Sequence, residues 1–173
     1  EDLPDANLHI DKMDTSDALI AMLESQAESF SAVKVALPFI EVAAYAAYKK
    51  LSEQSTGRLI YAGAGTSARI GVQDGAELPP TFNWPKNRID FLIAGGASAL
   101  ISAIENAEDN TEAGVAAVKA KNVGVDDVVI GLAASGQTPY TVGVVNAAQD
   151  AGATTIGIAN NPNTALLQAV SYP

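Results

Sequence analysis

The chain has 173 residues, of which 48% are hydrophobic, and its ten basic and twenty acidic residues leave a formal net charge of −10. This length and apolar fraction are typical of one compact domain with a hydrophobic core. The acidic balance repels phosphate backbones and anionic lipid, so neither nucleic acid nor a membrane is expected as a partner. An anionic small molecule would have to be held by local hydrogen-bond donors.

The chain lacks cysteine, which excludes disulfides, thiolate metal sites and cysteine nucleophiles. His9 is the only histidine and lies in a polar stretch, which argues against a histidine-based triad or zinc site. No apolar run approaches the roughly 20 residues that cross a bilayer, and no basic-then-apolar leader opens the chain. The sequence therefore predicts a soluble, cytoplasmic protein.

Two regions of different character follow one another along the chain. Residues 1 to about 13 are polar and predict an irregular arm, and residues 14–53 predict a helical annex that Pro38 divides. We expect residues 1–53 to form this arm and annex and residues 54–173 to form the binding domain.

From Gly57 onward, strand and helix patterns alternate. This predicts α/β architecture, a three-layer αβα doubly wound parallel sheet of flavodoxin-like type with right-handed crossovers. Strands are expected near 58–63, 89–94, 127–132 and 153–158, and helices near 67–75, 97–107, 111–121, 138–150 and 163–170. The same rhythm predicts another strand after residue 173, so a carboxyl-terminal portion is expected to be missing.

The segment GAGTSA, residues 63–68, follows a strand and opens a helix. Its letters match a dinucleotide fingerprint, but a Rossmann site needs an acid at the end of the second strand, and Asp90 stands at the start of that strand. With Gly65 in the turn, Thr66 and Ser67 place two hydroxyls and several amides at a helix start, where an anion is favoured. Phosphate binding is the preferred interpretation, and simple capping of the helix is the alternative.

The segment ASGQTP, residues 134–139, repeats this chemistry at a second strand end. Ser135 and Thr138 offer hydroxyls, Gly136 allows close backbone approach, and Gln137 faces either the ligand or solvent. Two such turns at the carboxyl ends of parallel strands would converge on one crevice. Hydrogen bonds to a charged group contribute roughly 1.5–3 kcal/mol each, so these donors could hold a phosphate without lysine or arginine.

Three glutamates are candidates for acid–base chemistry. Glu77 precedes Pro79 and Pro80, and burial at a rigid corner would raise its pKa and suit a general acid, although a solvated loop acid is the more common case. Glu105 and Glu108 are three residues apart, which on a helix would place them on one face. The spacing alone does not say which of them points inward.

These motifs together resemble the sugar isomerase (SIS) domain family, and within it the N-acetylmuramic acid 6-phosphate etherases. The likeness runs from Ile10 to the end and is densest in GRLIYAGAGTSAR, ELPPTF, LIAGG, ENAED, DVVIGLAASGQTPY and GATTIGIANNP. It implies a five-stranded parallel sheet and a homodimer that binds sugar phosphate between its subunits. It also implies that the phosphate is held by Thr66, Ser67, Ser135 and Thr138.

The resemblance further implies a lyase without metal or organic cofactor that releases D-lactate from N-acetylmuramic acid 6-phosphate. Two glutamates would perform an elimination followed by water addition, and their counterparts by motif are Glu77 and Glu108. We expect Glu77 as acid and Glu108 as base, although coupled carboxylates can exchange roles. Two alternatives remain, a regulatory SIS module that binds sugar phosphate without catalysis and an aldose-ketose sugar-phosphate isomerase.

Four positions depart from the family pattern. The family usually has glycine at Ala68, arginine at Gln137, and serine and cysteine at Ala76 and Leu78. Loss of the arginine removes a fixed positive charge beside the second loop, so phosphate affinity or substrate choice is expected to differ.

Overall fold

The computed structural model describes residues 9–173, so most of the predicted amino-terminal arm lies outside the described residues. The sheet consists of four strands, β1 (Leu59–Gly63), β2 (Ile89–Ile93), β3 (Val128–Leu132) and β4 (Thr154–Ile158). The helices are α1 (Thr15–Glu53), α2 (Gly65–Phe82), α3 (Thr111–Ala120), α4 (Pro139–Asp150) and α5 (Ala165–Ala169). Three short 3-10 helices, η1 (Ile10–Lys12), η2 (Lys86–Arg88) and η3 (Ala97–Leu100), complete the elements.

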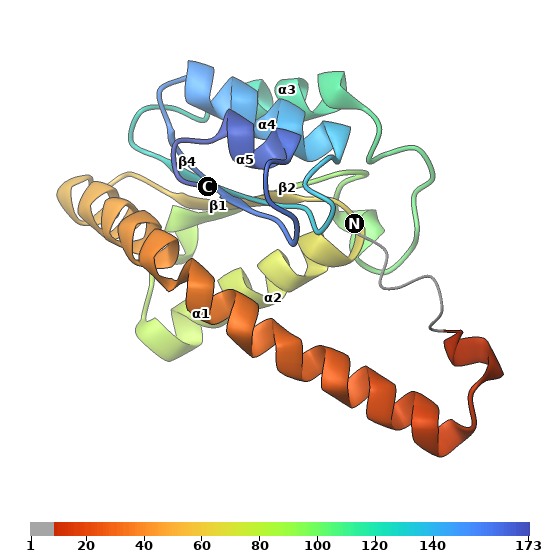
Figure 1. Cartoon of the computed structure of the whole chain (residues 1–173). Coiled ribbons are helices and arrows are strands. Elements are labelled where there is room, and N and C mark those ends of the chain that lie inside the picture. The colour runs from red at the N-terminus through yellow and green to blue at the C-terminus, as the bar shows by residue number, and fades with distance from the viewer. Residues whose placement is uncertain (1–8) are drawn as a thin grey trace.

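All strand pairs are parallel, and the strand order is β2-β1-β3-β4. The order reverses at the β1–β3 pair, in which Gly63 lies opposite Leu132 in the last register position. Helices cover both faces, with α3, α4 and α5 on one side and α1 and α2 on the other (Figure 1). The predicted three-layer αβα sheet is therefore confirmed.

Alternating side chains of the strands build the core on both faces of the sheet. On the first face, Ile60 and Val129 pack with Val144 of α4, and all three side chains are fully buried. On the second face, Val128 and Ile156 pack with the carboxyl-terminal part of α1. Both faces of the strands are covered, which explains why their sequences are continuous apolar runs.

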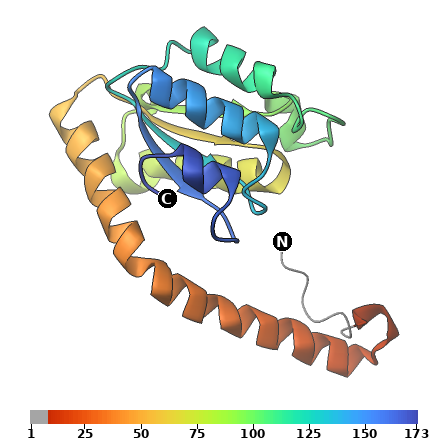
Figure 2. The same cartoon turned by 45° about the horizontal axis from the view of Figure 1, so that its top comes forward.

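The helical annex differs from the prediction because Pro38 does not divide it. Helix α1 is continuous over 39 residues with Pro38 inside it. A proline removes one backbone hydrogen bond and costs about 3 kcal/mol in a helix, a penalty that a long helix can absorb by bending. Figure 2 shows that α1 curves and that its amino-terminal half projects beyond the sheet.

Helix α1 is also more apolar and more exposed than expected. Only Ala43 and Leu51 are buried in it, whereas Leu23, Phe30 and Val35 are each more than two-thirds exposed. Among the described helices, α1 alone has the length and composition to cross a bilayer. This corrects the expectation that no segment reaches that length, and one such helix near the amino terminus is weak evidence for a membrane span.

One further expectation was wrong in detail. The helix expected over 97–107 is only the short η3, because Gly95 and Gly96 hold positive φ angles before it and Asn106 is left-handed with φ of 59°. Residues 9–173 contain four strands, and the fifth strand that the resemblance implies is expected after residue 173. Tyr172 forms a single parallel bridge to Ile156 at the free edge of β4.

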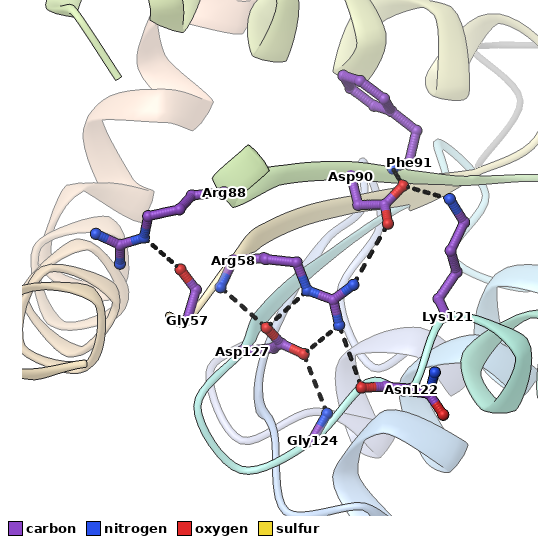
Figure 3. A network of polar contacts seen from close by, with 9 residues as sticks. All are labelled: Gly57, Arg58, Arg88, Asp90, Phe91, Lys121, Asn122, Gly124 and Asp127. Atoms are coloured by element: carbon purple, nitrogen blue, oxygen red, sulfur yellow. Dashed lines mark hydrogen bonds and ion pairs between the residues drawn. The ribbon is translucent and has the colours of Figure 1, made fainter. Parts of the chain in front are cut away.

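An ion-pair network ties the amino ends of the three strands β1, β2 and β3 together (Figure 3). Arg58 donates to Asp127 from its backbone N–H at 2.9 Å, from Nε at 3.1 Å and from Nη2 at 2.7 Å. Its Nη1 lies 3.5 Å from Asp90, which also accepts from Lys121 at 2.8 Å. The Gly124 N–H adds a further donor to Asp127 at 3.1 Å.

The network holds the Asp127 carboxylate in its charged form. Asp127 is only 5% exposed, and burial alone would raise its pKa. The hydrogen bonds from Arg58 and Gly124 and the Arg58 charge outweigh burial, so the pKa of Asp127 lies below its usual value.

We expect Asp127→Asn to lower the free energy of unfolding by about 2–4 kcal/mol at pH 7, because Arg58 loses its buried partner. The folded-state pKa is depressed, so this stabilisation is present above the unfolded pKa of about 3.9 and is lost as the pH falls through the folded pKa. Urea unfolding between pH 7 and pH 2 measures both effects. Asp126→Asn is the matched control and should change stability little; an equal loss in both variants would contradict the assignment.

Candidate sugar-phosphate site

The two hydroxyl-bearing loops lie next to each other at the carboxyl edge of the sheet. The first, residues 64–67, follows β1, and the second, residues 133–138, follows β3, the direct neighbour of β1. A Cβ on Gly63 would lie 3.0 Å from the Leu132 carbonyl oxygen and 3.2 Å from the Ala68 nitrogen, so the loops start in close contact. This pair of strands is the point where the strand order reverses, the usual ligand position in open α/β sheets.

The first loop leaves the start of α2 uncapped by any side chain. The N-cap residue is Ala64, and Gly65 takes a left-handed φ of 52° that turns the chain into the helix. Thr66 is exposed and Ser67 half-buried. The capping alternative is therefore not what the structure contains, and the first-turn amides and the helix dipole are available to an anion.

The second loop is held rigidly against the segment that precedes α5. Gly136 has a φ of 66°, its carbonyl accepts from Leu166 N–H at 2.9 Å, and a side chain there would overlap Thr164. The Ser135 hydroxyl accepts from Gln137 N–H at 3.2 Å, while the Gln137 side chain is exposed. Thr138 is the N-cap of α4 and makes no side-chain cap bond.

Sequence reasoning missed two residues that position these loops. Arg69 donates from Nε to the Leu100 carbonyl at 3.0 Å and from Nη2 to the Ala99 carbonyl at 3.2 Å, which joins η3 to α2 directly after the first loop. Thr164 is only 3% exposed and packs under Gly136. Arg69 directly follows GAGTSA in the sequence, and this position could have marked it as a residue that supports the first loop. No sequence pattern indicated the long-range contact between Thr164 and Gly136.

Glu77 does not lie at a buried corner. Helix α2 runs through Pro79 and Pro80 to Phe82, so Glu77 is a helical residue, and it is exposed. The helix persists because Gly71 and Gly75 pack closely on the sheet, where a Cβ would lie within 2.8–3.0 Å of side chains of Leu132, Phe91 and Tyr61. The double proline, expected to form a rigid corner, is therefore part of the helix.

The structure separates Glu77 from the loops and places Glu108 beside one of them. Twelve residues of helix, rising about 1.5 Å each, put Glu77 about 18 Å from Gly65 along α2. The Glu108 carbonyl instead accepts from Tyr140 N–H at 2.9 Å in the first turn of α4, next to the second loop. Glu105 and Glu108 do not share a helix face, because residues 101–110 form turns.

Residues 9–173 contain no group of three or more histidine, cysteine, aspartate or glutamate side chains that could hold a metal ion. A hollow of about 1010 Å³ lies beside β2 at the end of α2 and is lined by apolar side chains such as Pro79, Trp84 and Phe91. None of the predicted site residues lines this hollow. The chemistry available at the loops is therefore hydrogen bonding from hydroxyls and amides, with the backbone of Glu108 beside the second loop.

We expect Gly136→Ala to destabilise the protein by about 2–4 kcal/mol, because the added methyl group combines left-handed strain with overlap on buried Thr164. Gly65→Ala is the matched variant, since it has similar φ but open space around the added carbon, and should cost about 1–2 kcal/mol. Urea unfolding of both variants checks the difference. Equal losses would mean that the second loop is not packed as described.

Comparison with solved structures supports this fold. A phosphoheptose isomerase from Francisella tularensis matches with a TM-score of 0.66 and 21% identity over 92% of this chain and 82% of that chain. A Listeria monocytogenes protein, named as a candidate sugar-phosphate isomerase, matches with a TM-score of 0.53 and 18% identity. The match covers 93% of this chain and 73% of that chain. At these identities the likeness shows the fold alone.

Sequence relatives are much more similar. A protein of Deinococcus radiodurans, named N-acetylmuramic acid 6-phosphate etherase, is 50% identical over 158 residues, 91% of this chain and 51% of its own length. A protein of the same name from Cutibacterium acnes is 44% identical over 168 residues, 97% of this chain and 55% of its own length. The chain spans about half the length of the curated relatives it matches.

A family model described as the glucokinase regulatory protein N-terminal SIS domain matches residues 41–149, which include both loops and the segment between them. The parallel sheet, the paired loops and this match agree, and the chain belongs to the SIS domain family.

Proposed function

We propose that this chain is part of an N-acetylmuramic acid 6-phosphate etherase that produces N-acetylglucosamine 6-phosphate and D-lactate. The observation that carries the proposal is the similarity to relatives of that name, at 50% and 44% identity over nearly the whole chain. The proposed activity is that of the complete protein, because the matched relatives are about twice as long as this chain.

The two loops would hold the phosphate group of the substrate. The hydroxyls come from Thr66, Ser67, Ser135 and Thr138, and the backbone amide of Gly65 lies in the first turn. The N–H groups of Gly136 and Gln137 donate within the second loop, to the Ala133 carbonyl and the Ser135 hydroxyl. No lysine or arginine is needed, because hydrogen bonds to a charged group are worth roughly 1.5–3 kcal/mol each. The net charge of −10 opposes anion binding at long range, so these local donors must outweigh it.

The chemistry is an elimination followed by hydration. The open-chain sugar carries an aldehyde, which makes the adjacent C2–H acidic enough for the Glu108 carboxylate to remove its proton. The C3–O ether bond then breaks as Glu77 protonates the departing lactate oxygen, leaving an alkene conjugated to the aldehyde. Water adds at C3 and a proton returns to C2, so atoms and charge balance. The position of Glu108 beside the second loop supports its role as the base.

We further propose that the protein works as a cytoplasmic homodimer. The broad apolar surface of α1, with Phe30 79% exposed and Val35 75% exposed, supports association through this helix. A regulatory module of the same fold is the second candidate function, because the matching family model carries the name of a regulatory protein. A non-catalytic module would bind sugar phosphate through the loops and would not need both glutamates.

Incubation of the complete protein with N-acetylmuramic acid 6-phosphate, followed by enzymatic detection of D-lactate, tests the proposal. Glu108→Gln should reduce lactate release at least 100-fold while sugar-phosphate binding is retained, because only proton transfer is removed. Ser67→Ala with Ser135→Ala should instead weaken binding. Binding without lactate release in the unmodified protein would favour the regulatory module, and conversion between aldose and ketose without lactate release would indicate an isomerase.

A further inference from the structure

The chain between β2 and α3 is attached on either side to the helices that follow the two candidate phosphate loops. We call residues 95–108 the bridging segment. Near its start, Arg69 of α2 donates to the Leu100 carbonyl at 3.0 Å and to the Ala99 carbonyl at 3.2 Å. At its end, the Glu108 carbonyl accepts from Tyr140 N–H of α4 at 2.9 Å. The segment that carries Glu108 is therefore held by the first turns of both helices.

The middle of the bridging segment has little other support. Residues 101–106 are exposed, and Ile101 is 90% exposed. Ile104 packs on the backbone of Gly95, where an added Cβ would lie 3.0 Å from the Ile104 Cβ, so this contact folds the segment onto its own start. Ala107, at the other end, packs partly against the core. The position of the exposed part thus depends on how the segment is held on either side, and Arg69 supplies the polar contacts on the side of the first loop.

The contact made by Arg69 requires the shape of a guanidinium group. Ala99 and Leu100 are the last two residues of η3, where helix carbonyls lack partners within the helix. The planar guanidinium reaches both carbonyls at once, one from Nε and one from Nη2. A lysine ammonium carries the same charge but lacks this fixed pair of donors. The arrangement therefore fixes the direction of the segment as well as its distance from α2.

We propose that Arg69 is a positioning residue for Glu108, because it sets the place of the bridging segment relative to the phosphate held by the first loop. The inference rests on the proposed etherase function, in which the Glu108 carboxylate removes the C2 proton. A misplacement of about 1 Å in such a group can slow the reaction about 100-fold. Arg69 touches no substrate in this arrangement, since its Nε and Nη2 donors are directed at the carbonyls of η3.

Steady-state kinetics of lactate release by the complete protein tests this role. Arg69→Ala should lower kcat roughly 10- to 100-fold, while KM and the Kd of N-acetylglucosamine 6-phosphate stay within about twofold. Arg69→Lys keeps the charge and should recover only part of the loss, and Lys119→Ala on the exposed side of α3 is the control. Unchanged kcat in Arg69→Ala overturns the inference. So does weaker binding with unchanged kcat, because Arg69 would then hold the phosphate itself. A parent without any lactate release instead rejects the proposed function.

A double variant tests whether Arg69 acts through Glu108. Arg69→Ala should not reduce further the residual lactate release of Glu108→Gln, because the base that Arg69 positions is already lost. A further loss as large as that in the parent would mean that Arg69 acts independently of Glu108, which contradicts the inference.

Hydrogen exchange tests the same contact without activity. The amides of Ile101 and Ser102 both donate to the Ser98 carbonyl, within the part of the segment that Arg69 holds. In Arg69→Ala these amides should exchange about tenfold faster, while the amides of β1 and β3 keep their protection. Lys119→Ala should leave both sets unchanged. Equal exchange of Ile101 and Ser102 in the parent and in Arg69→Ala would show that Arg69 does not hold the segment.

Discussion

The parallel pairing of β1 with β3 is the constraint on which the rest of the structure depends. Because β1 lies between β2 and β3, the chain must cross to the opposite face of the sheet between β2 and β3, and the loops after β1 and β3 become neighbours. Gly63 allows the backbone of β3 and the start of α2 to approach closely at this point. At the amino ends, the Arg58–Asp127 ion pair joins the same two strands. The candidate phosphate loops therefore project from a pair of strands that is held at both ends.

The sheet also determines the position of helix α2 and of the residues that it carries. It begins in the first loop and packs through glycines on Tyr61 and Phe91, so its direction and depth are determined by the sheet. The same packing that presents the amides of its first turn to an anion carries Glu77 about 18 Å away from them. The amides of the first turn and the Glu77 carboxylate therefore lie in different parts of a helix that the sheet holds in place.

Helix α1 is only partly covered by the rest of the described chain. Its carboxyl-terminal part covers β3 and β4 through Ala43 and Leu51, while its amino-terminal part extends past the sheet with apolar side chains exposed (Figure 2). A helix that is apolar on most sides is stable in water only when something covers it. The relatives named as etherases are about twice as long as this chain.

Local patterns determined the four strands, the parallel sheet and the hydroxyl-bearing turns, because continuous apolar runs and glycine turns act over a few residues. Residue types also identified the candidate phosphate loops, which need only short-range geometry at strand ends. Other features depended on contacts between distant segments. We expected a break at Pro38 and a rigid corner at Pro79 and Pro80, yet the helices continue through all three prolines. The packing of α2 on the sheet and the length of α1 outweigh the hydrogen bonds lost at these positions. The support of Gly136 by Thr164, the place of Glu108 beside α4 and the distance of Glu77 from the loops were decided only by the tertiary structure, because no local pattern encodes the contacts that set them.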